Sequence, residues 1–399
     1  MRQDVEAEFD VVVIGGGPAG SSAAVTAARS GLRVCILDKS VFPREKLCGG
    51  LVTPRSKSIF QNVFDRKWKD DLFLASSNIR FTSEGRKLED VDGYQTLYFT
   101  KRFDFDNYLI SLAGEAGAVI FQGRGLDEID FESNSIKTTT GNYFSFKVLI
   151  GCDGVNSIVA RSLFGRSFDP DTIGFGLEVE VPRLKSSDMP NRVEIDFAGA
   201  NWGYGWAFPK NETTTIGVGG IHQLNPNLKD SLGRYLRSKG LDISNFKVKG
   251  QYIPFGDFKK IPGKGNILLC GDAAGVVDPI TGEGIAYAMQ TGHAAALAAS
   301  VAISSGDSRA ALGYYMKEYE KVVGDIAQAN FWRRFIFPKV IQGTFSWAFA
   351  DAGTLQRGYL DILSGTKQYN DLPGLFWLQV TKAVKKLGRK LLSIRGLSR

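Results

Sequence analysis

Three glycines near the amino terminus constrain the fold of this chain more than any other feature. Residues 9–14 (FDVVVI) are apolar and rich in β-branched side chains, which predicts a strand buried on both faces of a parallel sheet. The spacing GxGxxG begins directly after this strand at residue 15, and the small residues of 21–30 are typical of a helix. Residues 33–37 (RVCIL) predict a second strand. These elements form a βαβ unit of about thirty residues, the length that such a unit requires.

Each position of this motif has a mechanical role in a dinucleotide site. Gly15 allows a tight turn, Gly17 lets the backbone approach a pyrophosphate, and Gly20 lets the helix pack closely on the strand. The helix N-terminus faces the phosphate charge. Asp38 stands after the second strand, where an acidic residue binds ribose hydroxyls. A purely structural glycine turn is the alternative, but two strands and an acid in register favour a dinucleotide site.

Two later motifs indicate which dinucleotide is bound. Residues 151–154 (GCDG) and 271–274 (GDAA) each follow a predicted buried strand. In this order, the three motifs resemble those of the two-domain flavoprotein monooxygenases and reductases, which implies FAD. The resemblance places Asp272 against the ribityl chain and the helix that starts at residues 282–285 (GEGI) beside the isoalloxazine ring, where its partial positive charge stabilises reduced flavin. Taken singly, each motif could be a strand-to-helix turn with a capping aspartate.

Three further segments resemble the geranylgeranyl reductase family within the p-hydroxybenzoate hydroxylase-like flavoproteins. They are residues 43–50 (PREKLCGG), 102–109 (RFDFDNYL) and 204–209 (YGWAFP). The last is the most specific, since the FAD motifs are shared with hydroxylases and halogenases. The resemblance covers about residues 9–306 and implies an FAD-dependent oxidoreductase that acts on isoprenoid chains.

The motifs and the resemblance together predict a set of cofactor-binding residues. They are Gly15, Gly17, Pro18, Ala19, Gly20, Asp38, Lys39, Arg44, Cys48, Gly49, Gly50, Arg102, Leu126, Asp153, Gly154, Gly271, Asp272, Gly282, Gly284 and Ile285.

The predicted fold class is α/β, or α+β overall. A Rossmann-type FAD-binding domain carries an inserted antiparallel β-sheet domain, because short alternating strands separate the buried ones. The expected segments are 1–75, 100–170 and 257–325 for the FAD-binding domain, 76–99 and 171–256 for the substrate domain, and 326–399 for a C-terminal helical region.

Tyr204, Trp206 and Phe208 alternate along a predicted strand, so their side chains project to one face. That face is predicted to form a substrate wall against the flavin, and the alternative is a set of core aromatics. Tyr204, Trp206 and Cys48 are the catalytic candidates. The resemblance places Cys48 at the flavin, where it gates substrate or tunes the ring. Alkene reduction also requires a proton, for which Tyr204, Cys48 and water all remain open.

The other cysteines, Cys35, Cys152 and Cys270, are expected to be buried. Neither His222 nor His293 has a metal partner at motif spacing, so no metal is predicted.

The net charge of +7 resides in the C-terminal tail. No acidic residue follows Asp371, whereas seven Lys and Arg residues do, so residues 1–371 hold 42 of each sign and are formally neutral. Residues 373–399 are predicted to form a basic amphipathic helix that suits an anionic membrane surface. The alternative is the solvated face of a packed terminal helix. Nucleic-acid binding is not expected, because the rest of the chain is neutral.

A cytoplasmic location, peripheral to the inner face of the membrane, is expected. The chain has four cysteines without a Cys-x-x-Cys pair, and charged residues precede its first apolar run, so neither a disulfide framework nor a signal peptide is predicted. Residues 284–306 lack charge but are dominated by alanine, which favours a packed helix over a membrane span.

The leading hypothesis is a flavoenzyme that saturates isoprenoid double bonds, with NAD(P)H or a reduced ferredoxin as electron donor. A second is an FAD-dependent monooxygenase or halogenase on an aromatic substrate. The halogenase signature WxWxIP is not matched, since Tyr204 and Phe208 stand at its first and fifth positions. A third is a prenyl-lipid carrier without catalysis.

Overall fold

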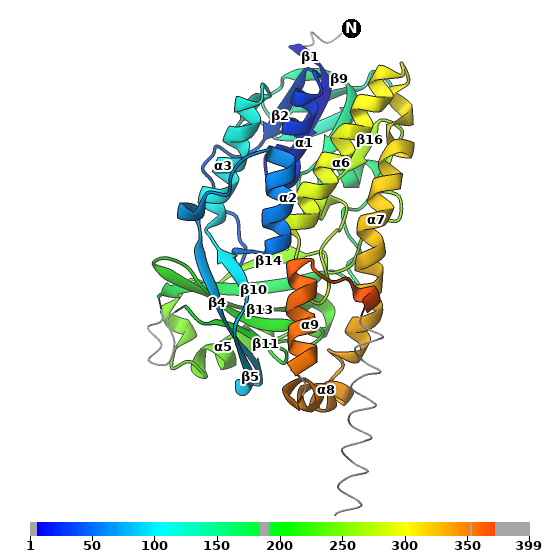
Figure 1. Cartoon of the computed structure of the whole chain (residues 1–399). Helices are drawn as coiled ribbons and strands as arrows, with labels where there is room; N and C mark the ends of the chain where they lie inside the picture. Colours follow the sequence, from blue (N-terminus) through cyan, green and yellow to red (C-terminus); the bar gives the residue numbers. More distant parts are fainter. Residues whose placement is uncertain (1–5, 184–190, 352, 372–399) are drawn as a thin grey trace, which may run out of the picture.

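The computed structural model describes residues 6–183, 191–351 and 353–371 (Figure 1). The basic segment 373–399, with its predicted amphipathic helix, lies outside the described residues, as does the end of the expected C-terminal region.

The βαβ unit folds as predicted. Strand β1 (Ala7–Ile14), helix α1 (Pro18–Arg29) and strand β2 (Val34–Asp38) follow one another, and β1 pairs with β2 in parallel, with Ile14 opposite Leu37. The later buried strands join the same sheet. Across it the order is β15 (Gly263–Lys264), β16 (Ile267–Leu269), β9 (Tyr143–Gly151), β1, β2 and β6 (Val119–Gln122), with β8 (Ser135–Thr138) pairing β9 and β7 (Leu126–Asp130) pairing β8.

Small residues let helices pack closely on this sheet. The charge-free stretch is the helix α6 (Ile285–Ser304), which lies against α1 (Figure 1). A side chain at Gly292 would meet the carbonyl oxygen of Ala19 at 2.0 Å, so the two backbones need glycine there. No helix among the described residues is long and apolar enough to cross a membrane. The other helices of this half are α2 (Pro54–Phe64), α3 (Arg102–Glu115), α4 (Ile158–Phe164) and α7 (Ala311–Trp332).

The second sheet is antiparallel as predicted, except at one pair of strands. Strand β11 pairs with β4 in parallel, with Val193 opposite Ile79. These strands come from distant chain segments, so no hairpin imposes an antiparallel register. The sheet also takes β3 from residues expected in the first domain. Across it the order is β14 (Lys249–Ile253), β10 (Gly174–Pro182), β13 (Thr213–Ile221), β12 (Tyr204–Pro209), β11 (Val193–Asp196), β4 (Leu74–Ser83), β5 (Arg86–Phe99) and β3 (Leu51–Val52).

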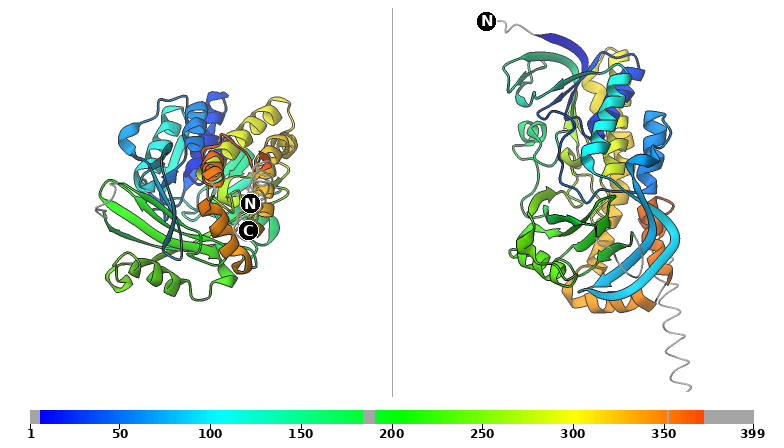
Figure 2. Two further views of the ribbon diagram at one scale, coloured as in Figure 1. Left: turned by 60° about the horizontal axis from the view of Figure 1, so that its bottom comes forward. Right: turned by 90° about the vertical axis from the view of Figure 1, so that its left-hand side faces the viewer.

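Helices cover both faces of this second sheet. Helix α5 (Leu228–Arg237) packs on one face through Leu232 and Leu236. Helices α8 (Lys339–Asp351) and α9 (Gly353–Ser364) pack on the other, and both lie in the C-terminal helical region that was expected over 326–399. Figure 2 shows the two sheets at opposite ends of an elongated molecule, with α7 running along both.

Candidate functional site

A cavity of about 750 Å³ lies where the two sheets meet. Its lining comes from the carboxyl ends of β1, β2, β9 and β16, where open α/β sheets bind ligands, and from β10, β12 and β14 of the second sheet. Such a volume falls in the range of ~300–1,000 Å³ that is typical of cofactor and ligand sites. All the cofactor-binding, substrate and catalytic residues predicted from the sequence line this cavity, except Gly20.

The backbone geometry of the glycine turn explains why Gly15 lines the cavity and Gly20 does not. Gly15 has φ of +99°, and a side chain on it would meet the carbonyl oxygen of Cys152 at 2.4 Å. Gly20 faces the turn itself, because its Cβ would lie 1.8 Å from the oxygen of Gly15. Gly17 caps α1 without any side-chain acceptor, so the first amides of this helix remain available to an anion in the cavity.

Asp38 lies at the far end of the cavity and is held by the backbone. Its Oδ2 accepts from the amide of Gly16 at 2.7 Å, and its Oδ1 accepts from Ser40 at 2.8 Å. Lys39 and Leu126 line the cavity beside it. The carboxylate is thus fixed between the glycine turn and the end of β2, where it was predicted to meet a ribose.

Two arginines lie beside the start of α1 and share one buried acid. Arg102 donates to both oxygens of Asp106, at 2.5 and 2.8 Å, and Arg44 lies 3.2 Å from Oδ2 of the same carboxylate. A Cβ on Gly17 would lie 3.5 Å from Nη2 of Arg44. The guanidinium groups are therefore positioned for a diphosphate at the helix N-terminus. Asp106 belongs to the segment 102–109 but was not predicted as a site residue.

Asp153 behaves as a capping residue, as the alternative interpretation held. Its carboxylate accepts from the Ser157 hydroxyl at 2.5 Å and from the amide of Ile158 at 2.6 Å, which fixes the start of α4. Burial raises its pKa. It also lines the cavity, whereas Asp272 lines it from the 3-10 turn Gly271–Ala273.

The predicted aromatic wall closes the other end of the cavity. The Tyr204 and Trp206 ring centroids are 5.9 Å apart, and those of Trp206 and Phe208 are 6.4 Å apart. The indole of Trp206 lies across glycines of β13, since a Cβ on Gly217 would meet it at 2.3 Å. Phe208 also packs on Phe99, at 5.4 Å, so it contributes to the core as well.

Two buried donors at the cavity fit a bound molecule with acceptor atoms. Among the described residues, neither Nη1 of Arg44 nor Nε1 of Trp206 has a hydrogen-bond partner. Such groups are costly to bury unless a ligand or water satisfies them. One lies at the cationic end and the other at the aromatic wall, so the cavity suits a long cofactor that reaches both.

Cys48 lies between these two ends. It is half-buried, its sulfur accepts from the amide of Gly50 at 3.4 Å, and Arg102 hydrogen-bonds to it. Cys35 and Cys270 are buried as expected, but Cys152 is only partly buried and lines the cavity, because it follows the end of β9 there.

Glu178 on β10 was missed by the sequence analysis. It is 8% exposed and lines the cavity. Burial raises its pKa to about 7, against the opposing influence of Lys210, and the backbone of Cys48 hydrogen-bonds to its carboxyl. The strand alternates, so Glu178 shares a face with Gly176, but nothing in the sequence indicates that this face meets the cavity. Lys46, also not predicted, lines the cavity too, and burial lowers its pKa.

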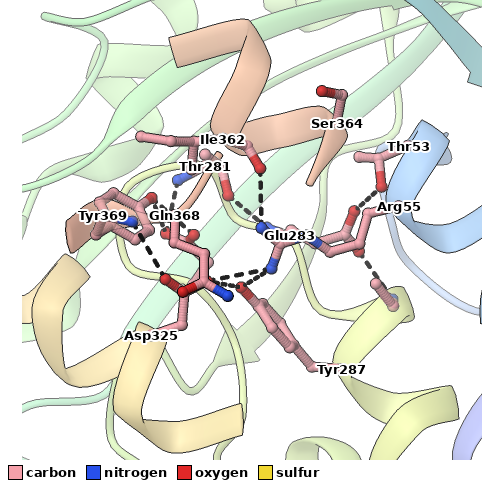
Figure 3. A network of polar contacts seen from close by, with 12 residues as sticks. Thr53, Arg55, Thr281, Glu283, Tyr287, Asp325, Ile362, Ser364, Gln368 and Tyr369 are labelled. Atoms are coloured by element: carbon pink, nitrogen blue, oxygen red, sulfur yellow. Dashed lines mark hydrogen bonds and ion pairs between the residues drawn. The ribbon is translucent and has the colours of Figure 1, made fainter. Parts of the chain in front are cut away.

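Glu283 precedes the N-cap residue of α6, and its carboxylate is held by hydrogen bonds within the protein. Its carboxylate accepts from the hydroxyl of Thr53 at 2.5 Å and from the amide of Ala286 at 2.9 Å, and it is drawn in Figure 3. Burial raises its pKa. The positive end of α6 is thus partly satisfied by this side chain, while Gly284 and Ile285 line the cavity.

A buried polar network ties the loop that contains Asp278 and Glu283 to the end of the described chain (Figure 3). Arg55 contacts the hydroxyl of Tyr287 and lies 3.2 Å from Oδ2 of Asp325. The amide of Tyr369 donates to Asp325 at 3.3 Å, and its hydroxyl donates to Asp278 at 2.7 Å. Through these contacts α2, α6, α7 and the turn at Tyr369 hold the cavity loop in place.

The geometry defines a two-domain flavoprotein, with a dinucleotide cradle on one sheet and an aromatic wall on another. A family model described as FAD dependent oxidoreductase matches residues 10–98. Geranylgeranyl diphosphate reductase of Rhodobacter capsulatus is 33% identical, over 79% of this chain and 82% of that protein. Digeranylgeranylglycerophospholipid reductase of Methanococcus vannielii is 30% identical, over 75% of this chain and 79% of that protein. The chain belongs to the geranylgeranyl reductase family of FAD-dependent oxidoreductases.

Solved structures share the fold. A geranylgeranyl bacteriochlorophyll reductase-like protein of Thermoplasma acidophilum matches with a TM-score of 0.72 and 23% identity, over 90% of this chain and 92% of that one. The flavin-dependent brominase Bmp2 matches with a TM-score of 0.70 and 20% identity, over 96% and 100%. Since both classes fit equally well, the fold does not separate reductases from halogenases.

A Gly15→Ala substitution should remove FAD from the purified protein. The added Cβ meets backbone rather than a movable side chain, and the positive φ is strained besides. Gly31→Ala is the matched control, because Gly31 has φ of +77° but nothing within 4 Å of its Cβ. We expect flavin absorbance per protein to fall at least about tenfold in the first variant and to stay near wild type in the second. Equal flavin content in both would contradict this role of Gly15.

Proposed function

We propose that this protein reduces carbon–carbon double bonds in a prenyl chain that carries a polar head. The observation that supports this most is the polarity of the cavity. At the end of the cavity opposite the guanidinium groups that would hold FAD, β12 presents three aromatic rings, which offer an apolar surface to a prenyl chain. Relatives named for the reduction of geranylgeranyl diphosphate and of digeranylgeranylglycerophospholipid support an apolar isoprenoid substrate.

The residues of the cradle would hold FAD. Arg44 and Arg102, oriented by Asp106, would neutralise the diphosphate together with the first amides of α1. Asp38 would take the ribose, and Asp272 the ribityl chain. When bound, FAD supplies the hydride.

The wall on β12 would orient the substrate and exclude water. Tyr204 is fixed, because its hydroxyl donates to the carbonyl of Thr281 at 3.0 Å. Trp206 and Phe208 continue the same face and offer only apolar surface besides the indole nitrogen. A prenyl chain packed on these rings would be removed from contact with water. Its double bond would then lie at the flavin end of the cavity.

Glu178 is the group best suited to supply the proton. The alkene takes a hydride at one carbon and a proton at the other, and the carboxylate regains its proton from water. Burial raises the pKa of the Tyr204 hydroxyl, which makes it a weak acid, and its proton is committed to Thr281. The carboxyl of Glu178, with a pKa of about 7, matches the acidity that proton donation near neutral pH requires.

Anaerobic incubation with dithionite and a geranylgeranyl lipid tests this function. Mass spectrometry should show a gain of about 2 Da for each double bond reduced, the mass of H₂. The flavin-free Gly15→Ala variant serves as the control and should give no gain. If no prenyl substrate gains mass with the flavin-loaded protein, the proposal is wrong.

The brominase-like fold keeps oxidative chemistry as the second candidate. An FAD-dependent monooxygenase or halogenase would consume a reduced nicotinamide only with oxygen and an aromatic substrate present. Reduction of a prenyl chain under argon excludes that mechanism. A non-catalytic prenyl carrier would neither retain nor require FAD, so flavin content separates it from both enzymes.

The electron donor and location belong to the same proposal. Electrons come from NAD(P)H or from a reduced ferredoxin, and anaerobic flavin bleaching with each donor in turn distinguishes them. The seven basic residues that follow Asp371 would attract the chain to anionic lipid on the cytoplasmic face of a membrane.

A further inference from the structure

Exposed apolar side chains gather at the end of the molecule farthest from β1. Val340 is 95% exposed, Trp347 60%, Phe331 50% and Phe335 49%. Phe331 and Phe335 touch, with ring centroids 5.4 Å apart. Figure 1 and the right view of Figure 2 place α8 at this end. We call this set of four residues the α8 surface.

Helix α8 carries large apolar side chains on both of its faces, which is unusual for a surface helix. Its inner face carries Phe345 and Phe349, which pack on Phe197 at 5.2 and 5.0 Å. Val340 and Trp347 are seven residues apart and project from the opposite face. Large apolar side chains exposed on one face of a helix often mark an interaction site, which indicates that a partner covers the outer face of α8.

The charges beside this surface indicate what covers it. Residues 326–350 contain no acidic residue but include three basic ones, of which Arg334 and Lys339 are exposed. Aromatic rings flanked by Arg and Lys are typical of segments that lie at a membrane interface. We propose that the α8 surface inserts into the headgroup region of a lipid bilayer, with Arg334 and Lys339 at the phosphates.

The position of α8 connects such a membrane to the cavity. One apolar cluster contains Trp206 and Phe208 of the wall together with Phe337 and Phe349 beneath the α8 surface. A membrane at the α8 surface would therefore lie over the same apolar core that carries the wall, where the proposed substrate packs. This connection rests on the proposed function, whereas the argument from exposure and charge does not.

The test uses the full chain and vesicles of pure phosphatidylcholine at about 1 M salt, where the Debye length is about 3 Å and attraction through basic residues is screened. Wild type should cosediment with these vesicles. V340E/W347E places two charges on the α8 surface and should bind at least about tenfold more weakly. The matched control, I261E/V301E, adds the same charges at residues 58% and 49% exposed in the other half of the molecule and should bind like wild type.

Several results would overturn the inference. One is vesicle binding by V340E/W347E equal to that of wild type, and another is no binding by wild type. Flavin content and thermal melting should match among all three proteins, so a loss of binding is not a loss of fold. If sedimentation without lipid shows a wild-type dimer that the V340E/W347E variant cannot form, a second copy covers the surface and the inference is again wrong.

Failure of the proposed function would look different. The V340E/W347E variant should still reduce a prenyl substrate dispersed in detergent at the wild-type rate. If no variant reduces any prenyl substrate but the pattern of vesicle binding holds, the proposed function fails and the lipid-binding surface stands.

Discussion

A Glu178→Gln variant should reduce a prenyl substrate about 10²–10⁴-fold more slowly than wild type, the usual contribution of a positioned general acid. The amide keeps the shape of the side chain but cannot release a proton at neutral pH. Because Glu178 lines the cavity from β10 of the second sheet and is not one of the residues that would hold FAD, FAD binding should be unchanged. Single-turnover oxidation of the reduced enzyme by substrate, under argon, measures the step directly.

The pH dependence of the same step has a fixed sign. Burial raises the pKa of Glu178 to about 7, so the carboxyl is protonated below that pH and can donate. The wild-type rate should be level in mild acid and fall about tenfold per pH unit above 7. Glu178→Gln should lose this inflection. Infrared spectra offer a readout apart from activity, since the band of the protonated carboxyl should vanish in the variant.

Glu180→Gln is the matched control on the same strand. Glu180 accepts from Thr215 at 2.7 Å and lies 3.5 Å from Lys210, away from the cavity lining. Its negative charge raises the pKa of Glu178, so its removal should move the inflection to lower pH and leave the maximal rate nearly unchanged. Equal rate losses in the Gln variants at positions 178 and 180 would mean that the strand, not the proton, was affected.

The residues predicted for the cradle come together in the structure because backbone geometry dictates their residue types. Gly15 must adopt a positive φ against the end of β9, and Gly20 must admit the oxygen of Gly15, so no other residue fits either position. The aromatic wall was predictable for a similar reason, since alternation along a strand fixes which side chains share a face. Local sequence rules thus predict each secondary-structure element and which side chains share one of its faces.

What the sequence could not predict depends on contacts between distant segments. Asp106 orients Arg44 across about sixty residues of chain, and Glu178 has an elevated pKa mainly because it is buried where the two sheets meet. The parallel pairing of β11 with β4 also joins segments without a local connection. Hydrophobic periodicity predicts neither the burial of a particular polar side chain nor the direction in which one sheet faces another. These features therefore become visible only in the structure.

An Arg55→Met substitution should destabilise the fold strongly. Arg55 lies 3.2 Å from Asp325, contacts the hydroxyl of Tyr287 and donates to the carbonyl of Ile362 at 3.0 Å, so it joins α2 to α6, α7 and α9. Methionine keeps much of the apolar stem but leaves the carboxylate of Asp325, which is only 11% exposed, without its cation. Breaking an ion pair that is buried to this extent costs about 3–5 kcal/mol.

For a chain of this length, that loss corresponds to a fall in melting temperature of roughly 4–6 °C, taking ~2.1 cal/mol/K of unfolding entropy per residue. Arg66→Met is the matched control: its ion pair with Glu115 is about half exposed on both sides, so the change should cost ~0–1 kcal/mol. Limited trypsin digestion should localise the damage. With Arg55 replaced, cleavage at Arg357 of α9 should precede cleavage elsewhere in the described chain, because the helix loses its tie to α2. Equal melting temperatures for the two variants would mean that the network of Figure 3 does not hold α9, and that packing on the second sheet suffices.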